Sequence, residues 1–206
     1  DGIKVSDCGI NGAGVITRNQ TTQNIGYGID ISVGPRGGCH NVTTMMNVSS
    51  YNASEGLRVV GGINNKWSQN EINGNWNAGF IAKAASNVTF RDSGLYDNNR
   101  SSYNGKGEIG SKSSIQISAT HTDQNGNVIT YDPNYGFIAE ILDTQVHYTG
   151  LGSNAQKIGL LIENNVGALS DDSRNIIKVD DVGFIGQDYA IDLSEVDVTN
   201  LRLSLG

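Results

Sequence analysis

The chain has 206 residues and a formal net charge of -7 at pH 7, because 21 Asp and Glu residues outnumber 14 Lys and Arg residues. An acidic chain without a basic run lacks the electrostatic footprint for nucleic acid, so nucleic-acid binding is disfavoured. No apolar run approaches the length that spans a bilayer, which disfavours membrane insertion. Two cysteines, Cys8 and Cys39, are too few for a disulfide framework. We expect them to be reduced and buried, with a single bridge as the alternative.

A glycine followed by apolar residues at alternate positions recurs along the chain. It occurs at Gly28, Gly56, Gly79, Gly136 and Gly159. Two steps of 23 residues and one of 28 separate neighbouring copies, which is the period range of a solenoid whose units stack on one another. The stretch from Gly79 to Asn99 is the clearest unit, with three short extended pieces separated by Ser, Asn, Gly and Asp.

Two polar segments interrupt this repeat. Residues 98-114 have no strand pattern and are predicted to form a loop, whereas residues 121-135 contain Asn125-Gly126, a tight-turn dipeptide that predicts a hairpin insertion. We therefore expect one domain over residues 1-206 with two insertions. The chain begins inside an apparent strand, so we also expect it to be a fragment of a longer protein.

An amide residue precedes the second extended piece of several units. The pairs are His40-Asn41, Ser86-Asn87, Thr144-Gln145 and Arg174-Asn175. If these corners stack, their side-chain amides can form a hydrogen-bonded ladder along the solenoid.

Together these features resemble the right-handed single-stranded parallel β-helix of the pectate-lyase-like superfamily, and the resemblance implies an all-β solenoid of about seven coils. Members include pectate lyases, polygalacturonases, alginate epimerases, adhesins and bacteriophage tailspikes, so the fold leaves the function open. The irregular insertions and the lack of a disulfide framework favour a tailspike. Such a protein would sit in the virion tail and recognise bacterial capsule or O-antigen polysaccharide, which we expect it to depolymerise by glycoside hydrolysis. The alternatives are a noncatalytic trimeric shaft or adhesin, secreted or at the bacterial surface, and a polysaccharide lyase.

An apolar strip is predicted on the outer face of the first strands. If Phe80 and Ala82 face inward, Ile81 faces outward, and the same alternation places Ile138 and Leu161 outward. An exposed apolar strip marks a contact surface. Two further copies in a homotrimer would cover it, and the alternative is a cover from the same chain.

Two glutamates are the first candidates for catalysis. The same alternation places Glu140 and Glu163 in one outward column on adjacent coils, about 4.8 Å apart. Carboxylates that close shift each other's pKa and resemble the pair of a retaining glycoside hydrolase. The alternative is two solvated surface glutamates.

Other residues suit saccharide binding or a different reaction. A lyase or epimerase needs a base beside a charge-neutralising cation, and Arg58 and Lys83 are the best-placed basic residues. Acidic and aromatic side chains suited to a sugar-binding groove are Asp92, Asp97, Trp67 and Trp76. The sequence shows no zinc-ligand spacing, no dense Asp cluster for calcium and no phosphate-binding glycine loop, so we expect no metal or cofactor.

Overall fold

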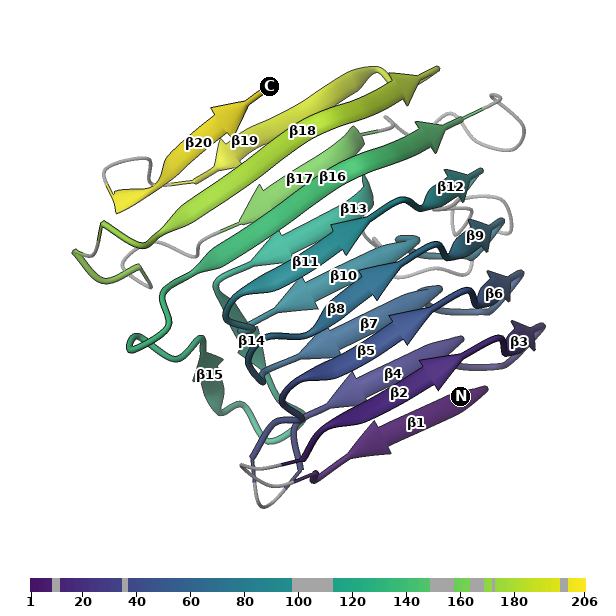
Figure 1. The fold of residues 1–206 in the computed structure, drawn as a ribbon, viewed down its shortest axis with the longest axis horizontal. Coiled ribbons are helices and arrows are strands. Elements are labelled where there is room, and N and C mark those ends of the chain that lie inside the picture. The colour runs from purple at the N-terminus through teal and green to yellow at the C-terminus, as the bar shows by residue number, and fades with distance from the viewer. Residues whose placement is uncertain are drawn as a thin grey trace.

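The computed structural model describes residues 1-8, 12-34, 37-97, 113-148, 158-163, 169-171, 173-196 and 200-206. These residues form a stack of parallel strands with no α-helix (Figure 1). The two termini lie at opposite ends of the stack. The predicted loop at 98-114 falls mostly outside the described residues, and its last two residues, Ser113 and Ser114, begin a strand. No helix long and apolar enough to cross a membrane occurs in the described part of the chain.

The first sheet contains one strand from each coil. Its seven strands, in spatial order, are β1 (Ile3–Ser6), β4 (Ile29–Ser32), β7 (Leu57–Val60), β10 (Phe80–Lys83), β13 (Ser113–Ser118), β17 (Ile158–Glu163) and β19 (Tyr189–Glu195). All neighbours are parallel. Seven stacked parallel strands confirm the predicted all-β solenoid and its number of coils.

Eleven of the remaining strands form a second sheet with two arms. One arm contains β2 (Gly14–Thr17), β5 (Val42–Met45), β8 (Lys66–Ser68) and β11 (Val88–Arg91). The other contains β3 (Gln20–Thr22), β6 (Val48–Ser50), β9 (Glu71–Asn73) and β12 (Gly94–Tyr96). The long strands β16 (Ile138–His147) and β18 (Ile176–Ile185) continue both arms, and β20 (Arg202–Leu205) pairs with β18.

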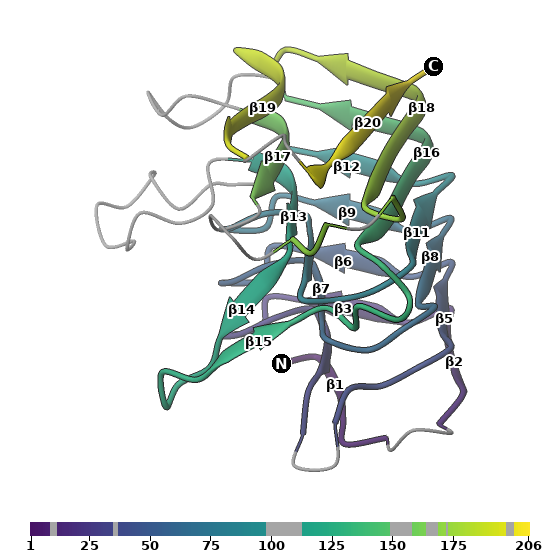
Figure 2. The same ribbon diagram turned by 90° about the vertical axis from the view of Figure 1, so that its left-hand side faces the viewer.

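A hairpin interrupts the stack between β13 and β16. Strands β14 (Thr120–Thr122) and β15 (Val128–Thr130) pair antiparallel, as the Asn125-Gly126 turn predicted. Figure 2 shows the hairpin projecting from the stack. A hydrogen bond connects the base of the hairpin to the stacked coils. The backbone N–H of Asp132, just after β15, donates to Ser86 Oγ at 2.8 Å.

The core fills the space between the sheets with inward side chains. Phe80 stacks on Phe90 with ring centroids 4.3 Å apart, and Trp67 packs against Phe80 at 5.5 Å. The repeated glycine is required where the chain turns into the first sheet. A Cβ at Gly56 would lie 2.5 Å from Ile72 Cγ2 and 2.8 Å from the Gly79 carbonyl oxygen, so a larger residue does not fit.

Asparagine ladders connect the corners of successive coils. The predicted ladder exists in part, because Asn64 donates to Asn41 at 3.3 Å and Asn87 donates to Asn64 at 2.6 Å. Two buried ladders were not predicted, and they consist of Asn19, Asn47 and Asn70 and of Asn24, Asn52 and Asn75. Thr144-Gln145 does not open a strand as expected, because it lies inside β16.

The predicted apolar strip is not exposed. Ile81 and Leu161 are only 2% and 8% exposed, so the single chain already buries them. Ile138 lies on β16 in the second sheet and never belonged to the strip. The expected homotrimer therefore loses the surface on which it was based.

The cysteines form a disulfide, so the expectation that they are reduced was wrong. Cys8 and Cys39 have Cα atoms 4.9 Å apart although 31 residues separate them in sequence. Stacking one coil on the next brings them together. A structural disulfide is typical of oxidising compartments, and it weakens the argument for assembly in the bacterial cytosol.

Candidate functional site

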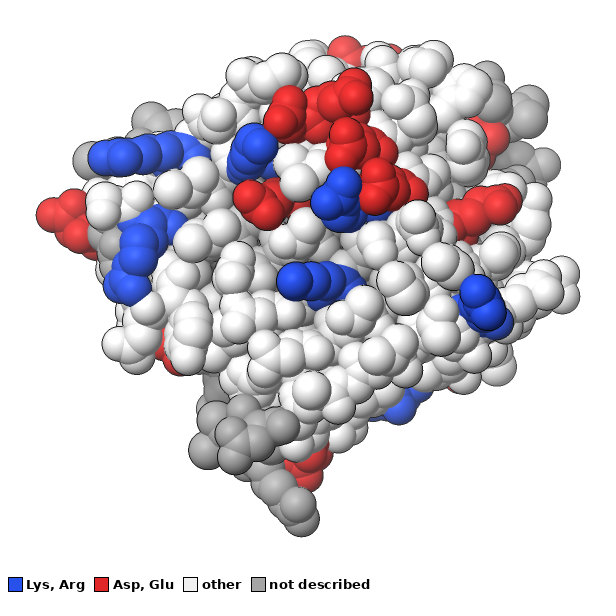
Figure 3. All heavy atoms as spheres, in the orientation of Figure 1, with Lys and Arg blue, Asp and Glu red and all other residues white. Residues whose placement is uncertain are grey.

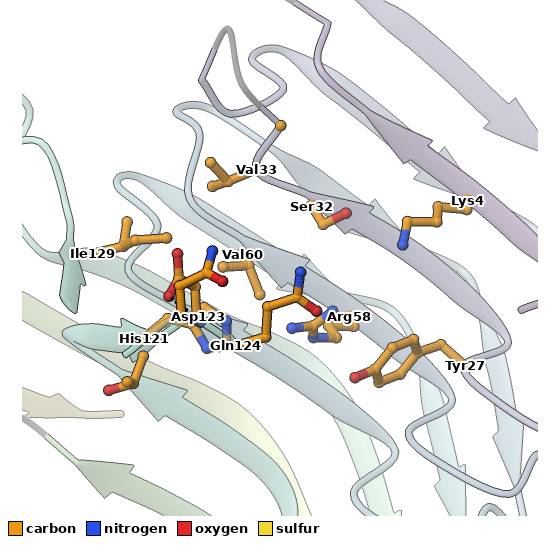
Figure 4. A pocket seen from close by; sticks show the side chains of 13 residues that line it. Lys4, Tyr27, Ser32, Val33, Arg58, Val60, His121, Asp123, Gln124 and Ile129 are labelled. Atoms are coloured by element: carbon orange, nitrogen blue, oxygen red, sulfur yellow. Dashed lines mark hydrogen bonds between the residues drawn. The ribbon is translucent and has the colours of Figure 1, made fainter. Parts of the chain in front are cut away.

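A cleft of about 650 Å³ lies between the outer face of the first sheet and the β14–β15 hairpin. The sheet contributes charged and polar side chains to the cleft, and the hairpin contributes residues 121-125 and Ile129 (Figure 4). The outward alternation of β1, β4 and β7 aligns Lys4, Asp30 and Arg58 in one column, since these residues are register partners. The cleft is therefore a product of the stacking and of the hairpin insertion together.

Two cations that line the cleft share one buried carboxylate. Asp30 is fully buried, Arg58 Nη1 donates to its Oδ1 at 3.0 Å, and Lys4 Nζ lies 3.8 Å from its Oδ2. Asp1 Oδ2 also lies 3.9 Å from Lys4 Nζ, so the two cations are shared between two carboxylates. Lys4 and Arg58 both line the cleft, and their N–H groups can bind an anionic group of a ligand.

Tyr27 lies next to Arg58 at the entry to β4. The Arg58 guanidinium carbon is 4.5 Å from the centroid of the tyrosine ring. Burial raises the pKa of Tyr27, and the negative charges of Glu55 and Asp30 raise it further, against the lowering effects of Arg58 and of a hydrogen bond with Ser54. The phenol is thus protonated at neutral pH and able to donate a proton.

His121 reaches the same cleft from the hairpin. Burial is the main cause that lowers its pKa, and the positive charges of Arg58 and Lys83 lower it further, whereas Asp123 raises it. The imidazole is therefore neutral at neutral pH. A neutral imidazole has the protonation state required of a general base.

Asp123 holds the tip of the hairpin in place. Its Oδ1 accepts from the backbone N–H groups of Asn125 and Asn127 at 2.8 and 2.9 Å, and its Oδ2 accepts from Asn127 Nδ2 at 2.9 Å. These bonds, those from Asn127 first, lower the pKa of Asp123. The carboxylate is engaged in the turn and positions the segment that carries His121.

The structure separates the predicted glutamate pair. Glu163 ends β17 in the first sheet, whereas Glu140 lies on β16 in the second sheet, so the expectation that they are adjacent was wrong. Glu140 accepts from Thr89 Oγ1 at 3.3 Å and faces Lys178 in the register, while Glu163 accepts from Gln116 Nε2 at 2.7 Å.

The hairpin explains this error. Gly136 resembles the glycine that opens a coil, but the hairpin stands between β13 and this glycine, and the chain continues into the second sheet. Sequence alternation alone does not distinguish a first-sheet strand from a second-sheet strand, because both have the same two-residue period.

The other predicted site residues divide into two groups. Arg58 lines the cleft, and Lys83 is close enough to lower the pKa of His121, so the structure brings these two cations together. Asp92 and Asp97 have positive φ angles of 48° at corners of the second sheet, outside the cleft. Asp92 accepts from Arg91 Nε at 2.9 Å.

The two tryptophans do not line the cleft. Trp67 is fully buried in the core, so the prediction that it binds substrate was wrong. Trp76 is half-buried in the turn before β10, and its backbone N–H donates to Asn52 at 2.9 Å. The predicted sugar-binding role of Trp76 stays a prediction.

Sequence reasoning missed three residues that line the cleft, Lys4, Tyr27 and His121, and the buried Asp30 that pairs with Lys4 and Arg58. One signal was present for three of them, because Lys4, Asp30 and Arg58 occupy the same outward position of successive strands and Tyr27 directly precedes a repeated glycine. Nothing in the repeat predicts that the hairpin folds back over this column. Among the residues that the structure describes, no group of three or more His, Cys, Asp or Glu residues is arranged to hold a metal ion.

The fold and its parallel register define this chain as a right-handed parallel β-helix. It is similar in structure to the A-module of the mannuronan C-5 epimerase AlgE4 from Azotobacter vinelandii, with a TM-score of 0.68 and 16% sequence identity over 98% of this chain. The chain spans 47% of that structure. No family model and no curated protein matches the sequence. At 16% sequence identity, this structural similarity shows a shared fold and does not assign a function.

Proposed function

We propose that the chain is part of a carbohydrate-active enzyme that removes the proton next to the carboxylate of a uronic acid in an anionic polysaccharide. The observation that carries the proposal is the convergence of Arg58, Tyr27 and His121 in one cleft. The name of the structural neighbour, a mannuronan C-5 epimerase, agrees with this chemistry.

Each group has a separate task in this reaction. Arg58 and Lys4 bind the sugar carboxylate and reduce its negative charge, which makes the neighbouring C–H bond more acidic. The neutral imidazole of His121 takes the proton. The protonated phenol of Tyr27 then gives a proton either to the opposite face of the same carbon, which is epimerisation, or to the leaving glycosidic oxygen, which is β-elimination.

Hydrolysis by a tailspike is less well supported by the geometry. Hydrolysis requires two carboxyl groups across the scissile bond. Among the described residues that line the cleft, Asp123 is the one carboxylate, and it is bound to the hairpin tip. The virion location and a capsule or O-antigen substrate stay proposals. If the chain is a noncatalytic shaft, we expect no activity on any of the polymers tested.

The test uses polymannuronate, polyguluronate, polygalacturonate and neutral capsular polysaccharides as substrates. We expect a uronate polymer either to gain an unsaturated product, detected by ultraviolet absorbance, or to exchange the C-5 proton for deuterium in D₂O, detected by NMR. His121→Gln, Tyr27→Phe and Arg58→Ala should each reduce the rate at least about 100-fold, the range for one acid–base group. Lys66→Ala, which removes an exposed charge from β8, is the matched control.

Three results would count against the proposal. New reducing ends without unsaturation, lost in Glu140→Gln or Glu163→Gln, would establish a hydrolase. Unchanged activity in the His121 and Tyr27 variants would remove the cleft as the site. Inactivity of the parent chain on every polymer would favour the noncatalytic shaft.

A further inference from the structure

A second concave surface, of about 460 Å³, lies on the other sheet and is independent of the proposed function. It follows β9 and β12 and the bends before them, and we call it the Tyr96 groove. Its lining residues are Gln69, Asn70, Glu71, Asp92, Gly94 and Tyr96. The cleft of the proposed function lies between the first sheet and the hairpin, and the two surfaces share no lining residue.

Tyr96 is held in a fixed position while part of its ring stays exposed. The phenol end of the ring covers Gly94, where an added Cβ would lie 2.7 Å from Tyr96 Cε2 and 2.8 Å from its hydroxyl oxygen. The His147 ring approaches at 6.4 Å and an interplanar angle of 73°. Tyr96 is 38% exposed. Glycine at position 94 therefore provides the space in which the ring lies.

Three polar side chains of the groove have no protein partner. Among the described residues, the Tyr96 hydroxyl, the Glu71 carboxylate and the Gln69 amide make no hydrogen bond or ion pair. Asp92, the other acid of the groove, differs, because Arg91 binds it at 2.9 Å and also binds Asp143 at 3.2 Å. Figure 3 shows acidic and basic side chains gathered on this face. The groove thus combines an anchored aromatic ring with unused hydrogen-bonding groups.

The chemistry of these groups selects a class of ligand. An exposed aromatic ring packs on the C–H face of a sugar, and carboxylate and amide groups bind sugar hydroxyls. Glu71 gives the groove a negative charge that Arg91, already bound to two carboxylates, does not offset, so a uronate would be repelled. We propose that the Tyr96 groove binds a neutral saccharide, as a noncatalytic subsite on the opposite sheet from the cleft.

The test measures binding of maltohexaose, cellohexaose, xylohexaose and mannohexaose, with hexamannuronate as the anionic comparison. Binding is followed by calorimetry and by ¹H,¹⁵N chemical shifts. We expect at least one neutral hexaose to bind and to shift the amide signals of β9 and β12. Tyr96→Ala should weaken binding at least about tenfold, because it removes the stacking surface. Tyr96→Phe should retain most of the affinity.

The controls separate a local effect from misfolding. Tyr189→Ala removes another exposed tyrosine from a strand of the first sheet and should leave the affinity unchanged. Glu71→Gln should weaken binding without changing the thermal midpoint. The proposal is overturned if no neutral hexaose binds, if Tyr96→Ala binds as tightly as the parent chain, or if hexamannuronate is the ligand that shifts the groove. None of these results depends on activity towards uronate polymers. Failure of this proposal can therefore be distinguished from failure of the proposed function.

Discussion

The guanidinium carbon of Arg58 lies 4.5 Å from the centroid of the Tyr27 ring, and the same guanidinium donates to the buried Asp30 at 3.0 Å. One cation thus connects a buried carboxylate below it with a titratable phenol beside it. The protonation of Tyr27 depends on this arrangement, since Arg58 lowers the pKa of Tyr27 while Asp30 and Glu55 raise it.

The first prediction concerns the pKa of Tyr27. Arg58→Met should raise this pKa further, because it removes the positive charge that stabilises the phenolate. Glu55→Gln should shift the pKa in the opposite direction. The measurement is a pH titration of the tyrosine ¹³Cζ signals, assigned with Tyr27→Phe. A downward shift in Arg58→Met would contradict the described contact.

The second prediction concerns the pH dependence of stability. The folded state lowers the pKa of His121 below its usual 6.5. Between that lowered pKa and 6.5, the unfolded chain binds more protons than the folded chain, so stability should fall as the pH decreases through this window. Urea unfolding at several pH values should show a smaller fall in His121→Gln than in the parent chain.

Lys83→Met provides the matching control for this histidine. Removing the positive charge of Lys83 should raise the pKa of His121 towards 6.5, as followed by the imidazole proton signals in NMR. Lys66→Met, on the second sheet, should leave the signal unchanged. Equal shifts in both variants would mean that the effect is general and not local to the cleft.

The third prediction distinguishes the two tryptophans. Trp67 is fully buried against Phe80, so Trp67→Ala should reduce the free energy of unfolding by about 3–5 kcal/mol through lost burial and a cavity. Trp76→Ala should cost about 1 kcal/mol because this side chain is only half-buried. Urea denaturation measures both. Equal losses would show that Trp76 also belongs to the core.

The fourth prediction tests a buried asparagine ladder. Asn52 accepts from Asn24 Nδ2 at 2.7 Å and donates to Asn75 Oδ1 at 2.8 Å. Asn52→Ala leaves buried partners unpaired and should cost about 3 kcal/mol in the free energy of unfolding. Asn73→Ala, on the outward side of β9, should change it by less than about 0.5 kcal/mol. An unchanged free energy of unfolding in Asn52→Ala would mean that water replaces the hydrogen bonds of the ladder.

The fifth prediction concerns the disulfide. The double variant Cys8→Ser, Cys39→Ser should lose about 3 kcal/mol of stability because the bridge closes a chain segment of 31 residues. Hydrogen exchange should increase most in β1 and β2, the strands of the first coil. A reducing agent should destabilise the parent chain and leave the double variant unchanged. Sensitivity of both proteins to the reductant would point to a different cause.

Local sequence patterns were sufficient to predict the solenoid. Apolar and polar residues alternate in strands such as Ile29–Ser32, and a glycine precedes several of these strands. These features and the amides at Asn41 and Asn87 depend on local geometry that recurs along the stack. The two-residue period of a strand also predicted that Arg58 and Lys83 face outward. The structure places both cations near His121. Local sequence rules therefore predicted the structure of one coil and its repetition along the chain.

Local patterns do not predict which coils and sheets the remaining residues share, because this depends on how the whole chain folds. Glu140 and Glu163 occupy similar local patterns but lie in different sheets, since the hairpin changes where the chain re-enters the stack. The tertiary structure pairs Cys8 with Cys39 and buries Trp67 and Ile81. It also places His121 in the same cleft as Arg58, far from it in sequence. The two-residue period specifies which side of a strand a residue faces, but the length of each insertion specifies what it faces.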